Sequence, residues 1–221
     1  MLYIIATPIG NLKDITLRAL EILKSVDFIL CEDTRVTRKL LSHYDIHKPL
    51  ISYHKYSSLK IYDKVSDLLN KGRNLALVTD SGTPGVSDPG NRLIKFLISK
   101  NHPLKISPIP GSSALTAAFS VSGIDNGQFV FLGFPPHKKG RKKFFSGLSR
   151  YNLPIVLYES PYRILSALKE LEESLGENIE LVVCRELTKI HEEIFRGTVK
   201  SAEIYFQDKT KGEFVVIIKK S

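Results

Sequence analysis

The sequence predicts an α/β protein with two domains, one built on a mainly parallel sheet and one α+β with a mixed sheet. Strand-like apolar runs alternate with helical patterns over roughly the first 110 residues, which is typical of a parallel sheet with helices on both faces. A segment rich in proline and glycine, 108–111, precedes a half in which strand-like runs are denser. We therefore expect an N-terminal domain at 1–112 and a C-terminal domain at 113–221.

The elements of the first half follow from apolar periodicity and from residues that begin or end helices. A helix at 16–24 carries Leu17, Leu20 and Leu23 at three-residue steps. A second helix has Ser58 as its expected N-cap and Gly72 placed to end it. The other expected elements are strands at 2–7, 26–31, 50–53, 74–79 and 104–107, and helices at 37–44 and 92–100.

The second half opens with a helix expected at 114–121 and continues mostly as strands. A final hairpin-like pair of strands is expected, and the chain holds no internal repeat or low-complexity segment. The expected strands are 128–134, 155–159, 180–187 and 213–219, and the expected helices are 143–150 and 162–175.

Composition is that of an ordinary globular protein, with 43% hydrophobic and 25% charged residues in a chain of 221. No apolar run is long enough for a transmembrane helix, and no basic region followed by a long apolar segment opens the chain, so we expect a cytoplasmic protein. Cys31 and Cys184 each lie in a strand-like run, which predicts core thiols.

The formal charge of +9 comes from 32 Lys and Arg against 23 acidic residues. An excess of this size indicates a polyanionic partner, most often nucleic acid. The alternative is a set of solvated lysines without a partner.

A loop rich in turn residues follows the strand expected at 74–79. Leu77-Val-Thr-Asp-Ser-Gly-Thr-Pro-Gly-Val-Ser-Asp-Pro-Gly90 holds three glycines, two prolines and two aspartates. The glycines permit close approach of a ligand to the backbone, the prolines stiffen the loop, and Asp80 and Asp88 supply acceptors. Because ligands of open α/β sheets bind where strands end, this loop predicts a wall of a small-molecule site. A tight structural turn with capping aspartates is the alternative.

Two further loops have the same character. Ala6-Thr-Pro-Ile-Gly-Asn-Leu12 opens the chain, and Ser107-Pro-Ile-Pro-Gly-Ser-Ser-Ala114 leads into the helix at 114–121. Ser112 is the expected N-cap, and a helix N-terminus favours a carboxylate or phosphate. An ordinary capped helix explains the second loop equally well.

Charged residues follow several other strands. Cys31-Glu-Asp-Thr-Arg35 could contact a substrate or form a local Asp33–Arg35 pair. Tyr158-Glu-Ser-Pro-Tyr-Arg163 and Arg185-Glu-Leu-Thr-Lys-Ile190 place acids and bases just after strands, where structural ion pairs would explain them nearly as well.

A basic segment, Pro136-His-Lys-Lys-Gly-Arg-Lys-Lys143, suits a phosphate backbone because each contact releases counterions. A solvated loop is the alternative, and aromatic stacking platforms are not evident in the segment. The expected RNA-binding residues are Lys138, Lys139, Arg141, Lys142 and Lys143, which Arg35, Arg38 and Arg163 could extend.

Common nucleotide and metal signatures are missing. Neither G-x-G-x-x-G after the first strand nor G-x-x-x-x-G-K-[ST] occurs. His191-Glu192 begins like a zinc-protease helix, but Phe195 stands where the second histidine would lie, so we expect no metal.

With these segments the chain resembles the tetrapyrrole methylase superfamily, and within it the ribosomal RNA small subunit methyltransferase I family. The resemblance runs the length of the chain and implies a tetrapyrrole-methylase-like fold with a cleft between the domains. The matching blocks are 6–16, 31–35, 78–90, 108–111, 133–136, 159–163 and 185–189.

The resemblance implies an enzyme that uses S-adenosylmethionine to methylate the ribose 2′-hydroxyl of a cytidine in the decoding region of 16S rRNA. It also implies a homodimer that acts on 16S rRNA or the 30S subunit. Gly82-Thr-Pro-Gly-Val86 matches the superfamily's Gly-Asp-Pro cofactor loop, with Thr83 in place of the aspartate. The residues implied to bind the cofactor are Pro8, Gly10, Asp80, Ser81, Gly82, Thr83, Pro84, Val86, Ser112, Ser113 and Tyr158.

A ribose hydroxyl is a poor nucleophile at neutral pH, so a nearby base should assist the transfer. The candidates are Glu159, Glu186 and Lys189; Lys189 would need a lowered pKa, or could instead orient the hydroxyl or a phosphate. Related sequences often continue into a small helical tail, whereas this chain stops at Ser221. Any contact with RNA that such a tail would supply must then be absent or be made by the 137–143 loop, which leaves isolated rRNA and the assembled 30S particle as alternative substrates.

Two other functions fit the same residues. One is a methyltransferase of a tetrapyrrole intermediate of the precorrin or uroporphyrinogen type, whose acidic ring would also suit a basic cleft. The other is a non-catalytic RNA-binding protein, which would take up no cofactor.

Overall fold

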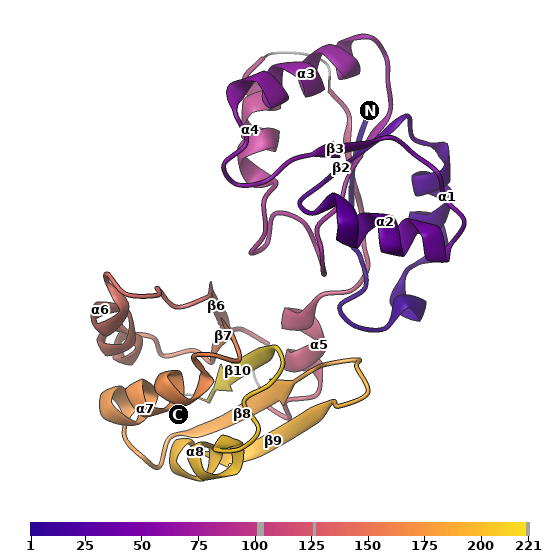
Figure 1. The fold of residues 1–221 in the computed structure, drawn as a ribbon. Coiled ribbons are helices and arrows are strands. Elements are labelled where there is room, and N and C mark those ends of the chain that lie inside the picture. Colours follow the sequence, from indigo (N-terminus) through magenta and orange to yellow (C-terminus); the bar gives the residue numbers. More distant parts are fainter. Residues whose placement is uncertain (101–103, 126, 220–221) are drawn as a thin grey trace. The chain divides into compact units, whose positions relative to one another are not determined.

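The computed structural model describes residues 1–100, 104–125 and 127–219, and the chain divides into two compact units, Met1–Ser113 and Ala114–Ser221 (Figure 1). None of the helices in these described ranges is long and apolar enough to cross a membrane. Cys31 and Cys184 are buried free thiols, as expected, and burial raises the pKa of Cys184 to about 11.

The first unit is a five-stranded sheet in the order β3-β2-β4-β1-β5, and every neighbouring pair is parallel. This confirms the parallel sheet predicted from the alternation of strands and helices. Its strands are β1 (Leu2–Ile5), β2 (Phe28–Cys31), β3 (Leu50–Ser52), β4 (Leu75–Leu77) and β5 (Ile106–Ile109). Its helices are α1 (Leu17–Ser25), α2 (Thr34–His43), α3 (Leu59–Asn70) and α4 (Asn91–Ser99), with a 3₁₀ turn η1 (Leu12–Asp14).

Helices cover both faces of this sheet because successive strand side chains point to opposite faces. In β2, Ile29 and Cys31 belong to the apolar cluster that contains Leu23 of α1 and Leu41 of α2. Leu30, between them, belongs to the cluster that contains residues of α3 and α4. The strands are therefore apolar on both sides, and their polar residues come only after they end.

The second unit is a mixed sheet in the order β6-β7-β10-β8-β9. Only β6 and β7 pair in parallel; β10 is antiparallel to both β7 and β8, and β8 to β9. Its strands are β6 (Val130–Gly133), β7 (Ile155–Glu159), β8 (Glu180–Arg185), β9 (Glu193–Thr198) and β10 (Phe214–Ile218). Its helices are α5 (Ala114–Ser120), α6 (Arg141–Ser146), α7 (Ile164–Leu175) and α8 (Val199–Phe206), with a 3₁₀ turn η2 (Gly147–Arg150).

Two apolar layers enclose the second sheet. Phe214 and Val216 of β10 face the cluster built with α6, α7 and α8, whereas Val215 and Ile217 face the cluster that contains Ala118 of α5. β8 and β9 form the antiparallel pair, so the expected hairpin lies before the last strand and not at the chain end.

Some helix boundaries differ from the sequence-based expectation. The helix expected at 37–44 begins at Thr34, because the Asp33 carboxylate caps it by accepting from the Arg35 N–H at 2.8 Å. Helix α8 and strand β9 were not predicted. Thr198 and Ser201 form a reciprocal capping box at the start of α8, with serine where glutamate or glutamine usually marks the motif.

Candidate active site

Three loops meet at one edge of the first sheet because β4, β1 and β5 are adjacent and parallel. The loop after β1 and the loop after β4 are joined by mutual backbone hydrogen bonds between Thr7 and Gly82, at 2.9 and 3.0 Å. The Thr83 hydroxyl donates to the Ser112 carbonyl at 3.1 Å, which ties in the loop after β5. The loops predicted from the sequence as walls of one site therefore form a single hydrogen-bonded edge.

Glycine is required at two places where these loops approach one another. Gly82 has φ +83°, a conformation that side chains rarely adopt. A Cβ on Gly111 would lie 3.0 Å from the Ala6 Cβ, closer than almost all real contacts. The loops can pack this tightly because both positions lack a side chain.

The residues expected to bind the cofactor in the first unit all lie on these three loops. Thr79 precedes them, and its buried hydroxyl has no hydrogen-bond partner within the described part of the chain. Gly10, Asp80 and Val86 are exposed, and the other members of the set are half-buried or buried. The set is Pro8, Gly10, Asp80, Ser81, Gly82, Thr83, Pro84, Val86, Ser112 and Ser113.

Ser112 is not the N-cap that the sequence predicted. Helix α5 begins at Ala114, two residues later, and the Ser112 hydroxyl donates instead to the Asp14 carbonyl at 3.2 Å. Ser112 therefore links the third loop to the first loop. We assign no anion-binding site to the N-terminus of α5.

An acidic corner adjoins the loop after β4. The Asp33 N–H donates to Asp80 Oδ1 at 3.1 Å, which joins the ends of β2 and β4. Asp80 is exposed as a residue, but partial desolvation of its carboxyl group, together with the charge of Asp33, raises its pKa above the usual 3.8; partial burial with the charge of Asp80 raises the pKa of Glu32. Arg35 instead holds the pKa of Asp33 down to about 2 through hydrogen bonds. Two carboxyl groups with raised pKa values at a strand end are typical of a functional site.

Arg35 makes the local pair with Asp33 that the sequence left as an alternative, at 2.6 Å, with most of its side chain in solvent. Arg38, one turn further along α2, is exposed. Both side chains remain accessible to an anionic partner.

The second unit gathers its charged residues at one sheet edge. Phe214 of β10 pairs with Glu159 on one side and with Arg185 on the other, so β7 and β8 end level with each other. Their ends lie roughly 10 Å apart, twice the spacing between neighbouring strands. The segments that follow them, which contain the expected catalytic residues, therefore leave the sheet at the same edge.

Glu159 is a buried ionic hub. Its side chain is 1% exposed and accepts from Arg163 at 3.0 Å and from Arg141 at 3.4 Å. The Ser160 N–H donates at 2.8 Å to Oε1 of Glu159, the oxygen that also accepts from Arg163, and Arg141 also reaches Glu170 at 2.7 Å. Since its oxygens are already engaged by cations and an N–H, Glu159 is placed to hold structure together.

Arg141 and Arg163 do not belong to an exposed basic surface, which corrects the sequence-based expectation. Their side chains are 10% and 16% exposed, because both turn onto Glu159. Lys138, Lys139 and Lys142 are exposed, as is Lys143, so the basic segment presents lysines to solvent and keeps its arginine inside.

Glu186 and Lys189 form a second network. The Lys189 ammonium donates to Glu186 at 2.8 Å and to Glu213 at 2.9 Å. Burial opposes the charge of both groups, but the pairing prevails, so the pKa of Glu186 is lowered and the pKa of Lys189 is raised. Lys189 is therefore protonated near neutral pH, opposite to what a lysine base needs and suited to orienting a hydroxyl or phosphate.

The turn that carries Lys189 has an uncommon backbone. Glu186 and Thr188 both have positive φ, 52° and 66°, which is a rare conformation for a β-branched residue such as Thr188. The Glu192 carboxylate accepts from the Thr188 N–H at 2.6 Å and holds the turn. Strain of this kind gathers at functional sites, and nothing in the local sequence signals it.

Tyr158 lies in an aromatic group at the same edge. Its hydroxyl accepts from the Leu115 N–H at 3.1 Å, and its ring contacts Phe131 and Phe134 at centroid distances of 4.9 and 5.4 Å. Phe134 is 52% exposed. The sequence analysis singled out Tyr158 but not Phe134, because exposure of one ring of a packed group is not visible in a linear pattern.

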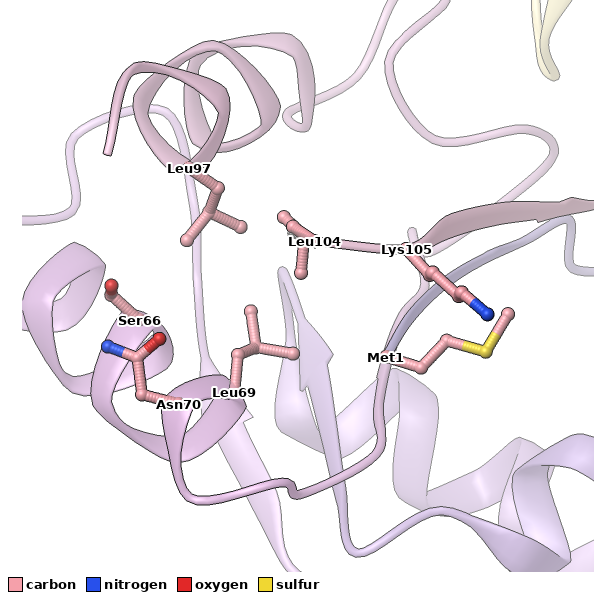
Figure 2. A pocket seen from close by; sticks show the side chains of 7 residues that line it. All are labelled: Met1, Ser66, Leu69, Asn70, Leu97, Leu104 and Lys105. Carbon is pink, nitrogen blue, oxygen red and sulfur yellow. The ribbon is translucent and has the colours of Figure 1, made fainter. Parts of the chain in front are cut away.

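A pocket of about 560 Å³ lies elsewhere in the first unit, lined by residues of α3, α4 and the amino ends of β1 and β5 (Figure 2). Three leucines, Leu69, Leu97 and Leu104, form much of its wall, with Lys105 and Met1 at one side. It contains none of the predicted site residues and lies at the sheet edge opposite the three loops. Over the described ranges no group of three or more His, Cys, Asp or Glu is placed to hold a metal ion.

Comparison with known sequences shows extensive similarity. The model of the family "Tetrapyrrole (Corrin/Porphyrin) Methylases" matches residues 1–203. The ribosomal RNA small subunit methyltransferase I of Thermotoga maritima is 43% identical over 218 residues, 98% of this chain and 97% of that protein. The protein of the same name from Synechocystis is 46% identical over 220 residues, 99% of this chain and 78% of that protein.

Solved structures share the fold at lower identity. Cobalt precorrin-4 methyltransferase superposes with a TM-score of 0.70 at 20% identity, covering 98% of this chain and 93% of that one. Uroporphyrin-III C-methyl transferase from Thermus thermophilus, complexed with S-adenosyl homocysteine, superposes with a TM-score of 0.68 at 16% identity, covering 98% and 96%. These two structures establish the fold of the chain.

We expect Glu159→Gln to lower the free energy of unfolding by about 3 kcal/mol, because it leaves two buried guanidiniums without their shared negative charge. Urea denaturation followed by circular dichroism measures the loss. The matched control is Glu180→Gln, which removes a carboxylate paired with Lys219 where both side chains are more than half exposed. The control should change stability by less than about 0.5 kcal/mol. Equal losses in both variants would show that the hub contributes no more than a surface pair.

We expect Asp80→Asn to stabilise the protein at neutral pH. A carboxyl whose pKa is raised by folding binds more protons in the folded state, so it costs stability as pH rises above the unfolded value of 3.8 and throughout higher pH. The amide keeps an acceptor for the Asp33 N–H and removes that cost.

The free energy of unfolding, measured from about pH 3 to about pH 8, should therefore be the same for both proteins at low pH and should differ increasingly as pH rises. The pKa of Glu32, followed by NMR, should also fall in the variant because Asp80 helps to raise it. A variant that is less stable than the parent at pH 7 would contradict the sign.

Proposed function

Because the chain belongs to the ribosomal RNA small subunit methyltransferase I family of the tetrapyrrole methylases, we propose that it methylates the ribose 2′-hydroxyl of a cytidine in the decoding region of 16S rRNA. The methyl donor of this family of methyltransferases is S-adenosylmethionine. The observation that carries the proposal is the near full-length match, above 40% identity, to relatives named for ribosomal RNA methylation. The +9 charge and the exposed lysines of 138–143 support a polyanionic substrate.

The donor site that we propose is the three-loop edge of the first unit. Gly82 and Gly111 let the three loops pack closely against one another, and Pro84 stiffens the loop after β4, so the edge is rigid before a ligand binds. The unpartnered Thr79 hydroxyl and the Asp80 carboxylate supply a donor and an acceptor for polar groups of the ligand. The residues present therefore fit a polar, neutral-to-cationic molecule such as the proposed donor.

When bound, S-adenosylmethionine supplies an activated methyl group on a positively charged sulfur. The task of the protein is to orient the ribose hydroxyl, and orientation can lower a barrier by roughly 7–11 kcal/mol. We propose that the protonated Lys189 orients the hydroxyl or a neighbouring phosphate. Glu186 and Glu213 hold its ammonium in place. The ionised carboxylate of Glu186, 2.8 Å from that ammonium, is the proposed group that attracts the proton lost by the ribose hydroxyl.

Glu159 takes a different role in this proposal from that of a base. Its carboxylate is enclosed by Arg141 and Arg163, so it acts by positioning the segments that carry them. Tyr158, directly before it, stays a proposed cofactor contact from the second unit.

The proposed partners are 16S rRNA, free or within the 30S subunit, and a second copy of the chain in a homodimer. The proposed location is the cytoplasm, where ribosomal subunits are assembled. Sedimentation of the purified protein at micromolar concentration reads the oligomeric state directly.

The central test is methyl transfer in vitro. We expect calorimetry to show S-adenosylhomocysteine binding, and labelled S-adenosylmethionine to methylate unmodified 30S subunits at one cytidine 2′-oxygen, mapped by its resistance to alkaline cleavage. A uroporphyrinogen substrate run in parallel should stay unlabelled. Methylation of the tetrapyrrole, of a base atom, or of nothing despite donor binding would contradict the proposal.

We expect Lys189→Ala and Glu186→Gln each to lower kcat by about 10²-fold while S-adenosylhomocysteine affinity stays near that of the parent, because both act on the acceptor hydroxyl. The matched control is Lys219→Ala, which removes an exposed, paired lysine and should leave kcat unchanged. Parent-like turnover in both site variants would remove the pair from the mechanism.

A further inference from the structure

We infer that Phe134 is a stacking platform for a nucleobase of the RNA substrate, and that the lysines of 138–143 hold the phosphates next to that base. The inference rests on the proposed function, since it takes the polyanionic substrate to be RNA. It assigns to Phe134 a contact that the charge of the segment alone does not supply.

The ring of Phe134 is both accessible and supported from behind. It is 52% exposed, and its inner side rests on Tyr158, which in turn contacts Phe131. The Tyr158 hydroxyl is itself fixed by the Leu115 N–H. A base that stacks on Phe134 therefore meets a ring whose position is set by packing, which lowers the entropy lost on binding.

Two more strongly exposed aromatic residues, Tyr56 and Tyr162, lack this support. Tyr162 is 95% exposed, and Tyr56 is also largely exposed, but neither has a ring contact in the described part of the chain. Single exposed aromatic residues are common on protein surfaces and need no function. Phe134 differs from these two residues because it is 52% exposed and its ring also packs against Tyr158.

The chain that leads from Phe134 to the lysines is held in place. Pro135 and Pro136 follow the ring directly, and their fixed φ angles limit its motion. Arg163 donates to the Pro135 carbonyl at 3.5 Å and Arg141 donates to the Pro136 carbonyl at 3.1 Å. Both guanidiniums are anchored on the buried Glu159, so the ionic hub fixes the backbone between the aromatic group and the basic segment.

The electrostatics of the segment suit a phosphate backbone. No acidic residue occurs in the sequence between Asp125 and Glu159, and Glu159 is buried and paired. Glu170, the other carboxylate near Arg141, is also paired with it. The charges of Lys138, Lys139, Lys142 and Lys143 are therefore not neutralised by acids of their own segment.

An exposed ring followed along the chain by a run of exposed lysines offers the two groups that bind single-stranded nucleic acid: bases stack on the aromatic ring and phosphates contact the cations. The sequence alone does not reveal this combination, because Phe134 precedes the lysines by several residues, two of which are prolines. We therefore assign to this surface an unpaired stretch of the RNA substrate.

The test measures binding of a fluorescein-labelled oligocytidylate by fluorescence anisotropy over a range of salt concentrations. We expect Phe134→Ala to weaken binding by about tenfold or more, the effect of losing one base–aromatic stack. Phe134→Tyr and Phe134→Trp should restore binding and Phe134→Leu should not, because leucine keeps apolar bulk but has no aromatic face. Tyr56→Ala is the matched control and should bind like the parent.

The salt dependence separates stacking from positioning. Phe134→Ala should lower affinity at every salt concentration without changing the slope of log K against log salt, whereas Lys139→Ala should reduce that slope by about 0.7. A changed slope in Phe134→Ala would mean that the ring acts only by arranging the lysines, and would overturn the platform. Parent-like binding by Phe134→Leu would also overturn it.

Two measurements guard against other roles of the ring. A lower affinity for S-adenosylhomocysteine in Phe134→Ala would place the ring in the donor site, and conversion of a dimer to monomers would place it in a subunit interface; either result overturns the inference. Its failure is distinguishable from failure of the proposed function. If the parent protein methylates 30S subunits but Phe134→Ala binds RNA normally, only the platform is wrong. If the parent methylates no ribose, the function is wrong whatever the ring does.

Discussion

The common direction of the strands in the first unit is the constraint on which the donor site depends. Because β4, β1 and β5 are parallel neighbours, the three turns that follow them leave the sheet at one edge. Strands covered on both faces by helices cannot carry the polar groups of a site, so these groups gather in the turns. The hydrogen bonds between Thr7 and Gly82, and between Thr83 and Ser112, then join the turns into one surface.

The second unit organises its edge by charge instead of by tight turns. Glu159 takes two guanidiniums out of solvent, and these reach back to the carbonyls of Pro135 and Pro136. Compared with an apolar cluster of the same size, a buried ionic group of this kind adds little net stability, because desolvation offsets the attraction; removing only the carboxylate is nevertheless costly, and the group defines one arrangement of its neighbours. The Glu186–Lys189–Glu213 network does the same for the turn after β8, where two residues with positive φ are held in place.

Much of the fold and part of the site could be predicted from local patterns. The alternation of apolar runs and helical periods indicated the parallel sheet, and the glycines and prolines of 77–90 indicated a polar turn at a strand end. Two features were missed. Asp33 was not recognised as the cap of α2, because the same residues also fit a charged surface loop. β9 and α8 were not recognised, because the start of α8 lacks an acidic capping residue. Ser112 was misassigned as a cap because a serine before a helical run fits that role in sequence, although its hydroxyl bonds to Asp14 across the fold.

By itself the sequence determined most of the order of strands and helices, the excess of positive charge and the turns able to enclose a ligand, because periodicity, composition and backbone freedom are properties of neighbouring residues. Only the tertiary structure decided which charges are free. Arg141 and Lys142 are adjacent and chemically alike, yet one is buried on Glu159, eighteen residues away, and the other faces solvent. The exposed ring of Phe134 and the protonated state of Lys189 depend in the same way on Tyr158 and Glu213, which only folding brings beside them.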